Sequence, residues 1–288
     1  MEIVLSQLAN GLVLGFLYVS IAIGLTIILG LLGIVNFAHG AFFALGAYIA
    51  LSLYEQFGWG AVIFAPIIVA IIGAIMEALL IRRIYGKDPL RGLILTFALA
   101  MGMEAIISYV WGSATRSLPV PGAFAGFVEL GPVFITNYRV AVMLAVIAML
   151  LALWAFLIFT PFGRILRAGS RDPEMVSLLG VNLPRVWMAT FALGCGLTGA
   201  AGVLAAPMWQ IMPTMSHGAI MPAFVIVAIG GLGSYAGAVV AGIAVGVVTA
   251  LTIQFWPAAS SAAMYALMVV TLLVRPRGLF GVKWERFE

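Results

Sequence analysis

A chain of 288 residues that is 64% hydrophobic and only 8% charged, with a mean hydropathy of +1.20, does not have the composition of a soluble protein. The net charge of +4 would suit a nucleic-acid ligand, but the basic residues are confined to a few segments between apolar stretches. At about 20 residues per membrane crossing, the length is used up by spanning helices and leaves no room for a soluble catalytic domain.

Three segments of the chain lack Asp, Glu, Lys and Arg entirely, namely 3–54, 140–163 and 186–274. A soluble domain needs a polar face, whereas hydrocarbon makes charged side chains expensive. The beginning of the chain has no basic stretch and no A-x-A-like cleavage site, so we interpret it as the first span rather than a signal peptide. The sequence predicts an all-α polytopic integral membrane bundle of about 8–9 transmembrane or re-entrant helices, forming a single transmembrane domain over 1–288.

Apolar stretches of membrane-spanning length predict nine helical segments in chain order. They are 8–31, 35–54, 61–82, 92–112, 139–160, 186–208, 217–231, 236–256 and 260–274. The break between Gly30 and Gly33 leaves few residues for a turn, and the segment 217–231 is short. Either place is therefore compatible with a broken or re-entrant helix instead of a complete crossing.

The basic residues predict which side of the membrane each connection faces. All Lys and Arg residues except Arg116 and Arg139 lie in three segments, 82–91, 164–185 and 275–286. The positive-inside rule places these segments in the cytoplasm, with the N-terminus outside and the C-terminus inside. Among the outer connections 113–138 is the longest, and we expect a soluble partner to bind there.

Small residues recur throughout the apolar segments. Gly11 and Gly15 form one G-x-x-x-G pair, and Gly242 and Gly246 form another. Glycine lets helix backbones approach closely in lipid, so we interpret these positions as packing sites, with a pore-lining role for some of them as the alternative. The single cysteine, Cys195, lies in an apolar span, so neither an internal disulfide nor a metal site is expected.

The segment 164–185 contains the most informative polar pattern. Asp172 is a favourable N-cap, Pro173 suits the first helical position, and Gly180 suits the left-handed residue that ends a helix. The pattern therefore predicts a two-turn helix over 173–179, between two membrane spans.

One face of this short helix is apolar, because Met175, Leu178 and Leu179 follow the i, i+3, i+4 spacing. Two turns of helix cannot bury such a face alone. The spacing leaves two interpretations open: a peg that docks into another protein, and a helix that lies on the membrane surface.

Several motifs resemble, in the same order along the chain, those of the permease subunits of branched-chain amino acid ABC importers. They are GLTIILGLLGIVNFAHG (24–40), LGAY (45–48), EALLIRR (77–83), DPL (88–90), RAGSRDPEMVSLLG (167–180), TF (190–191), GGLGS (230–234), GA (237–238) and RPRGLFG (275–281). The matches span nearly the whole chain, and the opening segment looks most like the first of the two permease subunits, the LivH type. Val176 departs from the family, whose loop usually has a small residue there, so docking could be altered at that position.

The resemblance implies a cytoplasmic coupling loop, about 161–185, that inserts into a groove on a separate ATPase subunit. The residues of this chain that match the coupling motif are Arg167, Ala168, Asp172, Met175, Leu178, Leu179 and Gly180. The sequence agrees with this division of labour, because neither Lys87 nor Lys283 has the G-x-x-x-x-G-K-[ST] spacing that cradles phosphates. We therefore expect a transport subunit that is not an enzyme and has no cofactor.

The resemblance also implies a set of partners and a function. The partners are two cytoplasmic ATP-binding subunits, a second homologous permease subunit, an extracytoplasmic solute-binding protein and the lipid bilayer, with no nucleic acid. The implied function is translocation of branched-chain or related amino acids across the inner membrane, driven by the separate ATPase subunits.

Polar residues at membrane depth are the candidates for the translocation path. The candidates are Asn36, His39 and Glu104. A structural role competes in each case, since Asn36 and His39 can join helices and Glu104 can form an interhelical hydrogen bond. Glu77 lies five residues before Arg82, and we expect it to pair with the basic cluster.

The two histidines occur in similar settings, AHGA (38–41) and SHGA (216–219), which is compatible with an internal repeat or with chance. Two other function classes are alternatives to a permease subunit. An autonomous ion-coupled secondary transporter or channel usually needs carboxylates near the midplane, for which Glu104 is the candidate. An intramembrane hydrolase using Ser234 and His217 is disfavoured, because no G-x-S-x-G elbow surrounds the serine.

Overall fold

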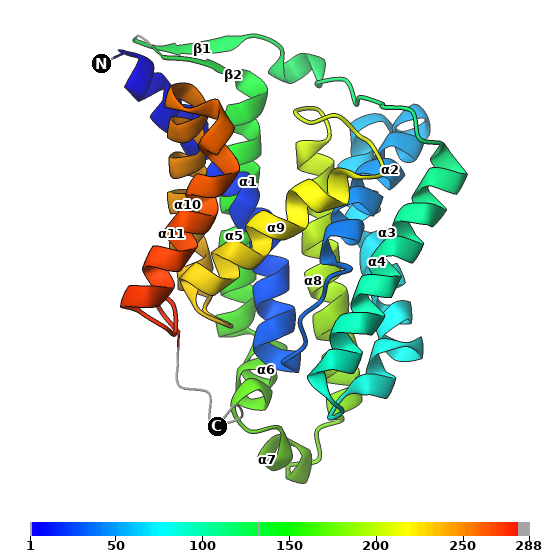
Figure 1. The fold of residues 1–288 in the computed structure, drawn as a ribbon. Helices are drawn as coiled ribbons and strands as arrows, with labels where there is room; N and C mark the ends of the chain where they lie inside the picture. Colours follow the sequence, from blue (N-terminus) through cyan, green and yellow to red (C-terminus); the bar gives the residue numbers. More distant parts are fainter. Residues whose placement is uncertain (1, 132, 282–288) are drawn as a thin grey trace.

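The computed structural model describes residues 2–131 and 133–281, which form a tall helical bundle with a small β-hairpin at one end (Figure 1). The helices are α1 (Glu2–Leu32), α2 (His39–Phe57), α3 (Ala61–Leu79), α4 (Pro89–Trp111), α5 (Asn137–Phe159), α6 (Pro161–Arg171), α7 (Pro173–Leu178), α8 (Leu183–Ala205), α9 (Met215–Gly230), α10 (Tyr235–Phe255) and α11 (Ser260–Val274). Strands β1 (Phe127–Leu130) and β2 (Val133–Thr136) pair antiparallel. Short 3₁₀ turns cover Gly58–Gly60, Ile81–Ile84, Gly122–Phe124 and Pro257–Ala259.

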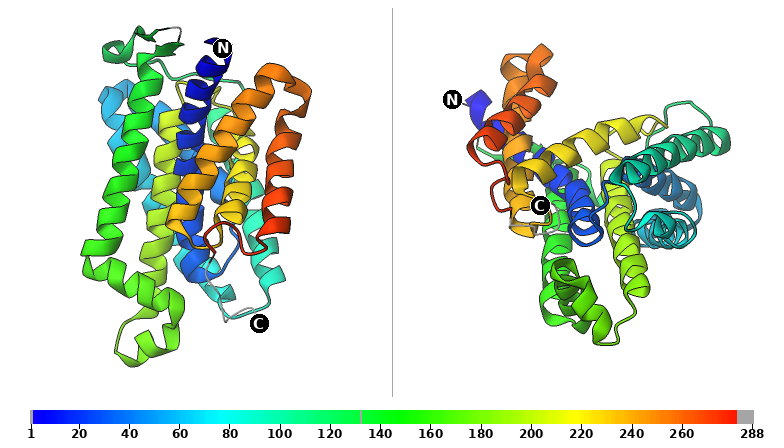
Figure 2. Two further views of the ribbon diagram at one scale, coloured as in Figure 1. Left: turned by 90° about the vertical axis from the view of Figure 1, so that its left-hand side faces the viewer. Right: turned by 60° about the horizontal axis from the view of Figure 1, so that its bottom comes forward.

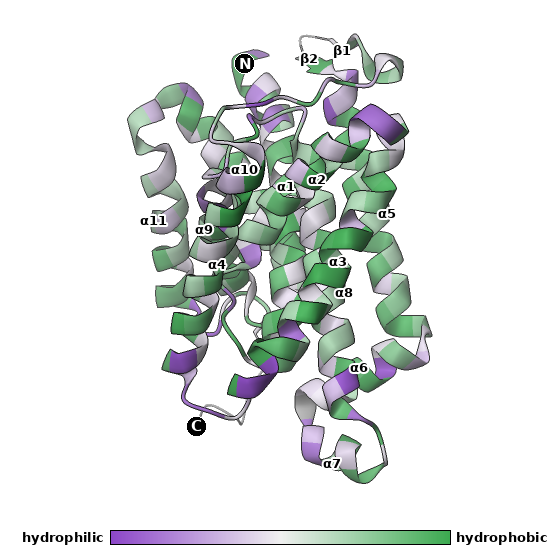
Figure 3. Cartoon of the chain, turned by 90° about the vertical axis from the view of Figure 1, so that its right-hand side faces the viewer, coloured by the Kyte–Doolittle hydropathy of each residue, from purple (hydrophilic) through white to green (hydrophobic). Residues whose placement is uncertain are grey.

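The bundle has the lengths and the surface of a membrane domain. Among the described residues, seven helical segments are long and apolar enough to cross a membrane, with α2 and α3 counted together as His39–Ile84, and the shorter apolar helix is α9. Figure 3 shows hydrophobic residues along the height of the bundle and hydrophilic ones mostly toward its two ends. These features confirm the predicted all-α polytopic membrane bundle.

The long helices run along the bundle between its two ends, whereas α9 crosses it obliquely and α6 and α7 lie at one end (Figures 1 and 2). The basic end carries the connections 80–88, 160–182 and 231–234 and the residues 275–281, and the hairpin end carries 58–60, 112–136, 206–214 and 256–259. The three predicted basic segments gather at the basic end, although Lys283 and Arg286 lie outside the described residues. Arg116 and Arg139 belong to the hairpin end.

The core is built around α8, which packs against α1, α2 and α3. Glycine makes this close packing possible: a Cβ added at Gly46 would collide with the backbone of Gly199 on α8. A Cβ at Gly15 on α1 would lie 2.9 Å from the Cα of Ile243 on α10. The two predicted G-x-x-x-G motifs therefore face each other across α1 and α10, which confirms the packing interpretation.

The predicted break after α1 is real, and it displaces the start of the next helix. α1 ends at Leu32, and α2 begins at His39 instead of near residue 35. In the connecting segment, the Asn36 side chain accepts a hydrogen bond from the Ala38 amide at 3.0 Å, which competes with helix formation. The hydroxyl of Thr96 on α4 donates to the Val35 carbonyl at 3.2 Å. These two non-helical backbone groups are thus paired with protein side chains, as hydrocarbon favours.

Two elements were not predicted from the sequence. The segment 161–171 was expected to be part of a loop, but it forms the helix α6, whose first turn is capped by the Thr160 hydroxyl accepting from the Gly163 amide at 3.1 Å. The connection 113–138 contains the β-hairpin, whose turn includes Gly131 at φ +63°. Both are short elements outside the apolar spans, and hydropathy does not detect them.

Candidate functional site

The short helix α7 forms at the basic end as the sequence predicted. The Asp172 carboxylate accepts a hydrogen bond from the Met175 amide at 2.9 Å, and Pro173 occupies the first helical position. At the other end, Gly180 has φ +82°, and its amide donates to the Ser177 carbonyl at 3.0 Å. Gly180 therefore ends the helix in the left-handed conformation, although the helix itself stops at Leu178.

The apolar face of α7 is open to the surroundings. Met175 is 54% exposed, Leu178 82% and Leu179 76%, and Figure 1 shows α7 beyond the rest of the bundle. Val176, in contrast, is buried. Its departure from the family pattern thus concerns the packing of α7 against the chain rather than the exposed face.

The helix α6 supports α7 and carries the other two predicted coupling residues. Arg167 and Ala168 are exposed on α6, and the Ala168 carbonyl accepts from the Asp172 amide at 2.9 Å. On the opposite side, Leu166 joins Leu31 and Val186 in a small second core at the basic end. All seven predicted coupling residues therefore lie on one supported substructure.

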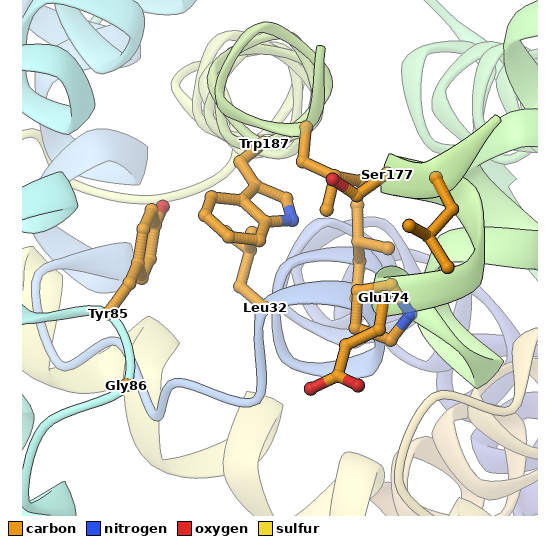
Figure 4. Close-up of a pocket in the computed structure, with 10 residues that line it drawn as sticks. Leu32, Tyr85, Gly86, Glu174, Ser177 and Trp187 are labelled. Atoms are coloured by element: carbon orange, nitrogen blue, oxygen red, sulfur yellow. The ribbon is translucent and has the colours of Figure 1, made fainter. Parts of the chain in front are cut away.

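A pocket of about 600 Å³, the basic-end pocket, separates α7 from the bundle (Figure 4). Its lining includes Leu32, Tyr85, Glu174, Ser177, Leu178 and Trp187. The rings of Tyr85 and Trp187 meet edge to face, with centroids 4.8 Å apart. Burial raises the pKa of Tyr85 above its ordinary value.

An ion pair with a buried carboxylate and a partly exposed guanidinium links α3 to the start of α8 beside this pocket. Glu77 is fully buried, and its carboxylate lies 2.8 Å from an Nη of Arg82. The same Arg82 nitrogen donates to the carbonyl of Pro184 at 3.2 Å. The predicted pairing of Glu77 with the basic cluster is confirmed, and the pair holds the chain just after α7 against α3.

Asn36 and His39 lie within the helix packing. Nε2 of His39 is 2.9 Å from the Ile21 carbonyl oxygen and 2.7 Å from the Thr198 hydroxyl, so one buried ring joins α1, α2 and α8. Asn36 is also buried, and its Nδ2 has no hydrogen-bond partner among residues 2–131 and 133–281. Neither residue lines the cavity that contains Glu104. A direct contact of either residue with cargo stays a prediction.

Glu104 lines a cavity of about 390 Å³ where the starts of α2 and α9 meet beside α4, and we name it the α4–α9 cavity. Its Oε2 lies 3.1 Å from Nε2 of His217 and accepts a hydrogen bond from the Ser216 hydroxyl at 3.2 Å. The His217 side chain is 69% exposed and that of Glu104 is 24% exposed. The sequence predicts Glu104 as a candidate path residue, but it does not predict the contacts of Glu104 with Ser216 and His217.

The two similar histidine settings mark a different contact, that between the starts of α2 and α9. AHGA (38–41) begins α2 and SHGA (216–219) lies in the first turn of α9. The two starts are in contact, because a Cβ on Gly40 would collide with the carbonyl oxygen of Ser216. The repeated His-Gly pair thus marks two helix starts that meet.

The hairpin end is tied to the start of α9. Arg116 and Ile211 exchange two backbone hydrogen bonds of 2.9 Å, which connect the 112–136 segment to the 206–214 segment. Arg116 also donates to the Trp111 carbonyl at 2.8 Å. A displacement of the 112–136 connection would therefore be transmitted both to the end of α4 and to the segment that leads into α9.

Comparisons with known proteins agree with these features. The sequence model of the family described as "Branched-chain amino acid transport system / permease component" matches residues 7–272. The high-affinity branched-chain amino acid transport system permease protein LivH of Escherichia coli (strain K12) is 30% identical, covering 96% of this chain and 95% of the relative. Its counterpart in Salmonella typhimurium is 31% identical and BraD of Pseudomonas aeruginosa 29% identical, each over the same shares of the two chains. No solved structure matches the chain.

Proposed function

The chain belongs to the branched-chain amino acid transport permease family, and on that premise we propose that it is the permease subunit of an ATP-binding-cassette importer. In this proposal the chain spans the bacterial inner membrane, with the basic end and residues 275–281 in the cytoplasm. Its cargo is a branched-chain or related amino acid. The concentration of basic residues at one end supports this orientation.

The observation that carries the proposal is the exposed apolar face of α7. A helix of two turns that leaves Leu178 and Leu179 more than three-quarters exposed suits a groove on another protein better than water. We assign the occupant of that surface as a cytoplasmic ATP-binding subunit, one for each of two permease chains. Arg167 and Ala168 on α6 extend the same contact.

Movement of the ATPase reaches the spanning helices through the supports of α7. The second core joins α6 to the end of α1 and the start of α8, and Arg82 joins the start of α8 to α3. A displacement of α7 thus acts on three spanning helices together, which is the requirement for rocking a bundle between outward-open and inward-open states.

The remaining partners are assigned to other surfaces. The hairpin end presents its longest connection, 112–136, to a soluble protein that delivers cargo. A second permease chain completes the path, because the α4–α9 cavity opens on the side of this bundle and Glu104 and His217 are partly exposed there.

Reconstitution of the full complex in liposomes tests the proposal. We expect ATP-driven uptake of leucine, isoleucine or valine, with ATP hydrolysis stimulated by the loaded binding protein. Replacing both Leu178 and Leu179 by Ser removes the apolar contact, so uptake and stimulation should both fall severely. Phe280→Ser is the control, because Phe280 is also apolar, half exposed and at the basic end.

Two outcomes would contradict the proposal. Undiminished coupling in the α7 double variant would remove the ATPase contact from α7. Uptake by the purified chain alone, driven by an ion gradient without ATPase subunits, would instead identify an autonomous secondary transporter.

A further inference from the structure

An ionisable pair lies uncovered on the side of the bundle at membrane depth. Glu104 is seven residues before the end of α4 at Trp111, or roughly 10 Å below it along the helix. The pair of Glu104 and His217 remains 24% and 69% exposed in the single chain. Ionisable groups within spanning segments face a protein interior or a water-filled cavity, because hydrocarbon disfavours them. This side of the bundle is therefore not a lipid-facing surface.

The polar groups of the α4–α9 cavity converge on one wall. Glu104 and Ser108 come from α4, and Ser216 and His217 come from the first turn of α9. Within residues 2–131 and 133–281, the Glu104 carboxylate has two polar partners, the Ser216 hydroxyl and the His217 ring. Both partners can rotate away, because His217 is largely exposed and serine hydroxyls turn freely. The carboxylate can thus be released to a cation.

The rest of the cavity lining is apolar, and we name it the apolar wall. It includes Phe37, Phe97, Met101, Ile220 and Met221. Phe37 is fixed between Phe97 and Phe224, with ring centroids 6.2 Å and 5.0 Å away. At about 390 Å³, the cavity is near the lower limit of small-molecule sites, which hold one compact ligand. A carboxylate facing an aliphatic and aromatic wall is complementary to an ammonium group that carries an apolar side chain.

We propose that the α4–α9 cavity is a cargo-binding station on the translocation path, in which Glu104 receives the ammonium group of an amino acid whose aliphatic side chain packs against the apolar wall. In the empty station, His217 and Ser216 hold the carboxylate, and the cargo displaces them. The class of cargo rests on the proposed function. The placement in the outer half of α4 makes this the first station after release from the binding protein.

The first test asks whether the cavity contains water. Cys195, the only native cysteine, is fully buried, so a single introduced cysteine can be followed with a charged, membrane-impermeant thiol reagent. Met101 in the cavity and Leu151 on α5 are each 60% exposed and form a matched pair. In the full complex, Met101→Cys should react at least tenfold faster than Leu151→Cys, and leucine-loaded binding protein should slow the reaction. Equal rates at both positions, or no reaction at Met101→Cys, would overturn the proposal.

The second test asks whether the charge of Glu104 is used. Glu104→Gln keeps the shape and a hydrogen-bond acceptor but removes the negative charge, so leucine uptake per ATP hydrolysed should fall about tenfold or more. Glu2→Gln makes the same chemical change at an exposed position on α1 and should leave that ratio within about twofold.

The failures of the two proposals are distinguishable. Absence of ATP-driven uptake in the unaltered complex would contradict the proposed function itself. Normal uptake in both the unaltered complex and the Glu104→Gln complex would overturn the cargo station alone. Failure of Glu104→Gln to assemble would assign Glu104 to helix packing and would also overturn it.

Discussion

At the scale of single residues, environment decides what the same side chain does. His39 and His217 occupy similar sequence settings, but His39 is fully buried between two hydrogen-bond partners, whereas His217 is 69% exposed beside a carboxylate. The His39 ring contacts polar groups on α1 and α8, which suits a side chain that holds helices together. The His217 ring can move without leaving a buried polar group unpaired, which suits a site that exchanges partners.

Gly180 is the residue on which the shape of α7 depends most directly. Its φ of +82° is readily adopted by glycine, and no atom within 4 Å opposes an added Cβ. Gly180→Val should therefore strain the backbone alone, by about 1–2 kcal/mol, and displace the end of the apolar face. We expect the variant to insert normally and to show ATP hydrolysis that no longer drives uptake, as measured in reconstituted liposomes.

A matched substitution separates backbone strain from loss of the glycine itself. Asparagine tolerates the left-handed region better than valine, so Gly180→Asn should retain more coupling than Gly180→Val. Equal coupling in the two variants would show that the left-handed turn is not needed for docking of α7.

At the scale of elements, hydropathy was a sufficient guide to the spanning helices. Each of the nine predicted segments overlaps an observed helix, because hydrocarbon imposes length and apolarity on every crossing. The boundaries differ by several residues in places, and one of them is set by a side-chain hydrogen bond. The start of α2 moves to His39 because Asn36 binds the Ala38 amide, and such a local competition has no signature in hydropathy.

The elements that were missed lie outside the apolar spans. The helix α6 contains Gly163 and Gly169 and three arginines, so its intrinsic helix preference is weak. It forms because Phe162, Ile165 and Leu166 pack into the second core. Contacts of this kind, and the meeting of Glu104 with His217 across a sequence separation of more than a hundred residues, are tertiary and could not be read from the local pattern.

The interface of α1 and α10 offers a direct test of glycine packing. A Cβ at Gly15 would lie 2.9 Å from the Cα of Ile243. A Cβ at Gly102 on α4, in contrast, would meet no described atom within 4 Å. Gly15→Leu should therefore force the two helices apart and destabilise the protein by about 1–3 kcal/mol or more. The measurement is the temperature of half-aggregation in detergent. Gly102→Leu is the control, and an equal loss in both variants would argue against close packing as the reason for Gly15.

At the scale of the whole molecule, the two ends of the bundle differ in charge and in the surfaces they offer. The basic end presents α7 and the basic-end pocket, while the hairpin end presents β1, β2 and the Arg116–Ile211 link. Between them, the α4–α9 cavity opens on the side of the bundle. In the proposed function, the basic end receives the motion of the ATPase, the hairpin end receives the cargo, and the cavity lies on the path between them.

The proposed function also predicts which end of the bundle faces the cytoplasm. Basic residues are retained on the cytoplasmic side during insertion, so we expect α7 inside the cell and β1 outside. With Cys195 buried, Leu179→Cys and Phe127→Cys provide reporters that are 76% and 70% exposed at opposite ends. An impermeant thiol reagent should label Phe127→Cys in cells whose inner membrane is intact, and Leu179→Cys after that membrane is opened. The reverse pattern would place α7 beyond the reach of a cytoplasmic ATPase, and the coupling role of α7 would then fail together with the orientation.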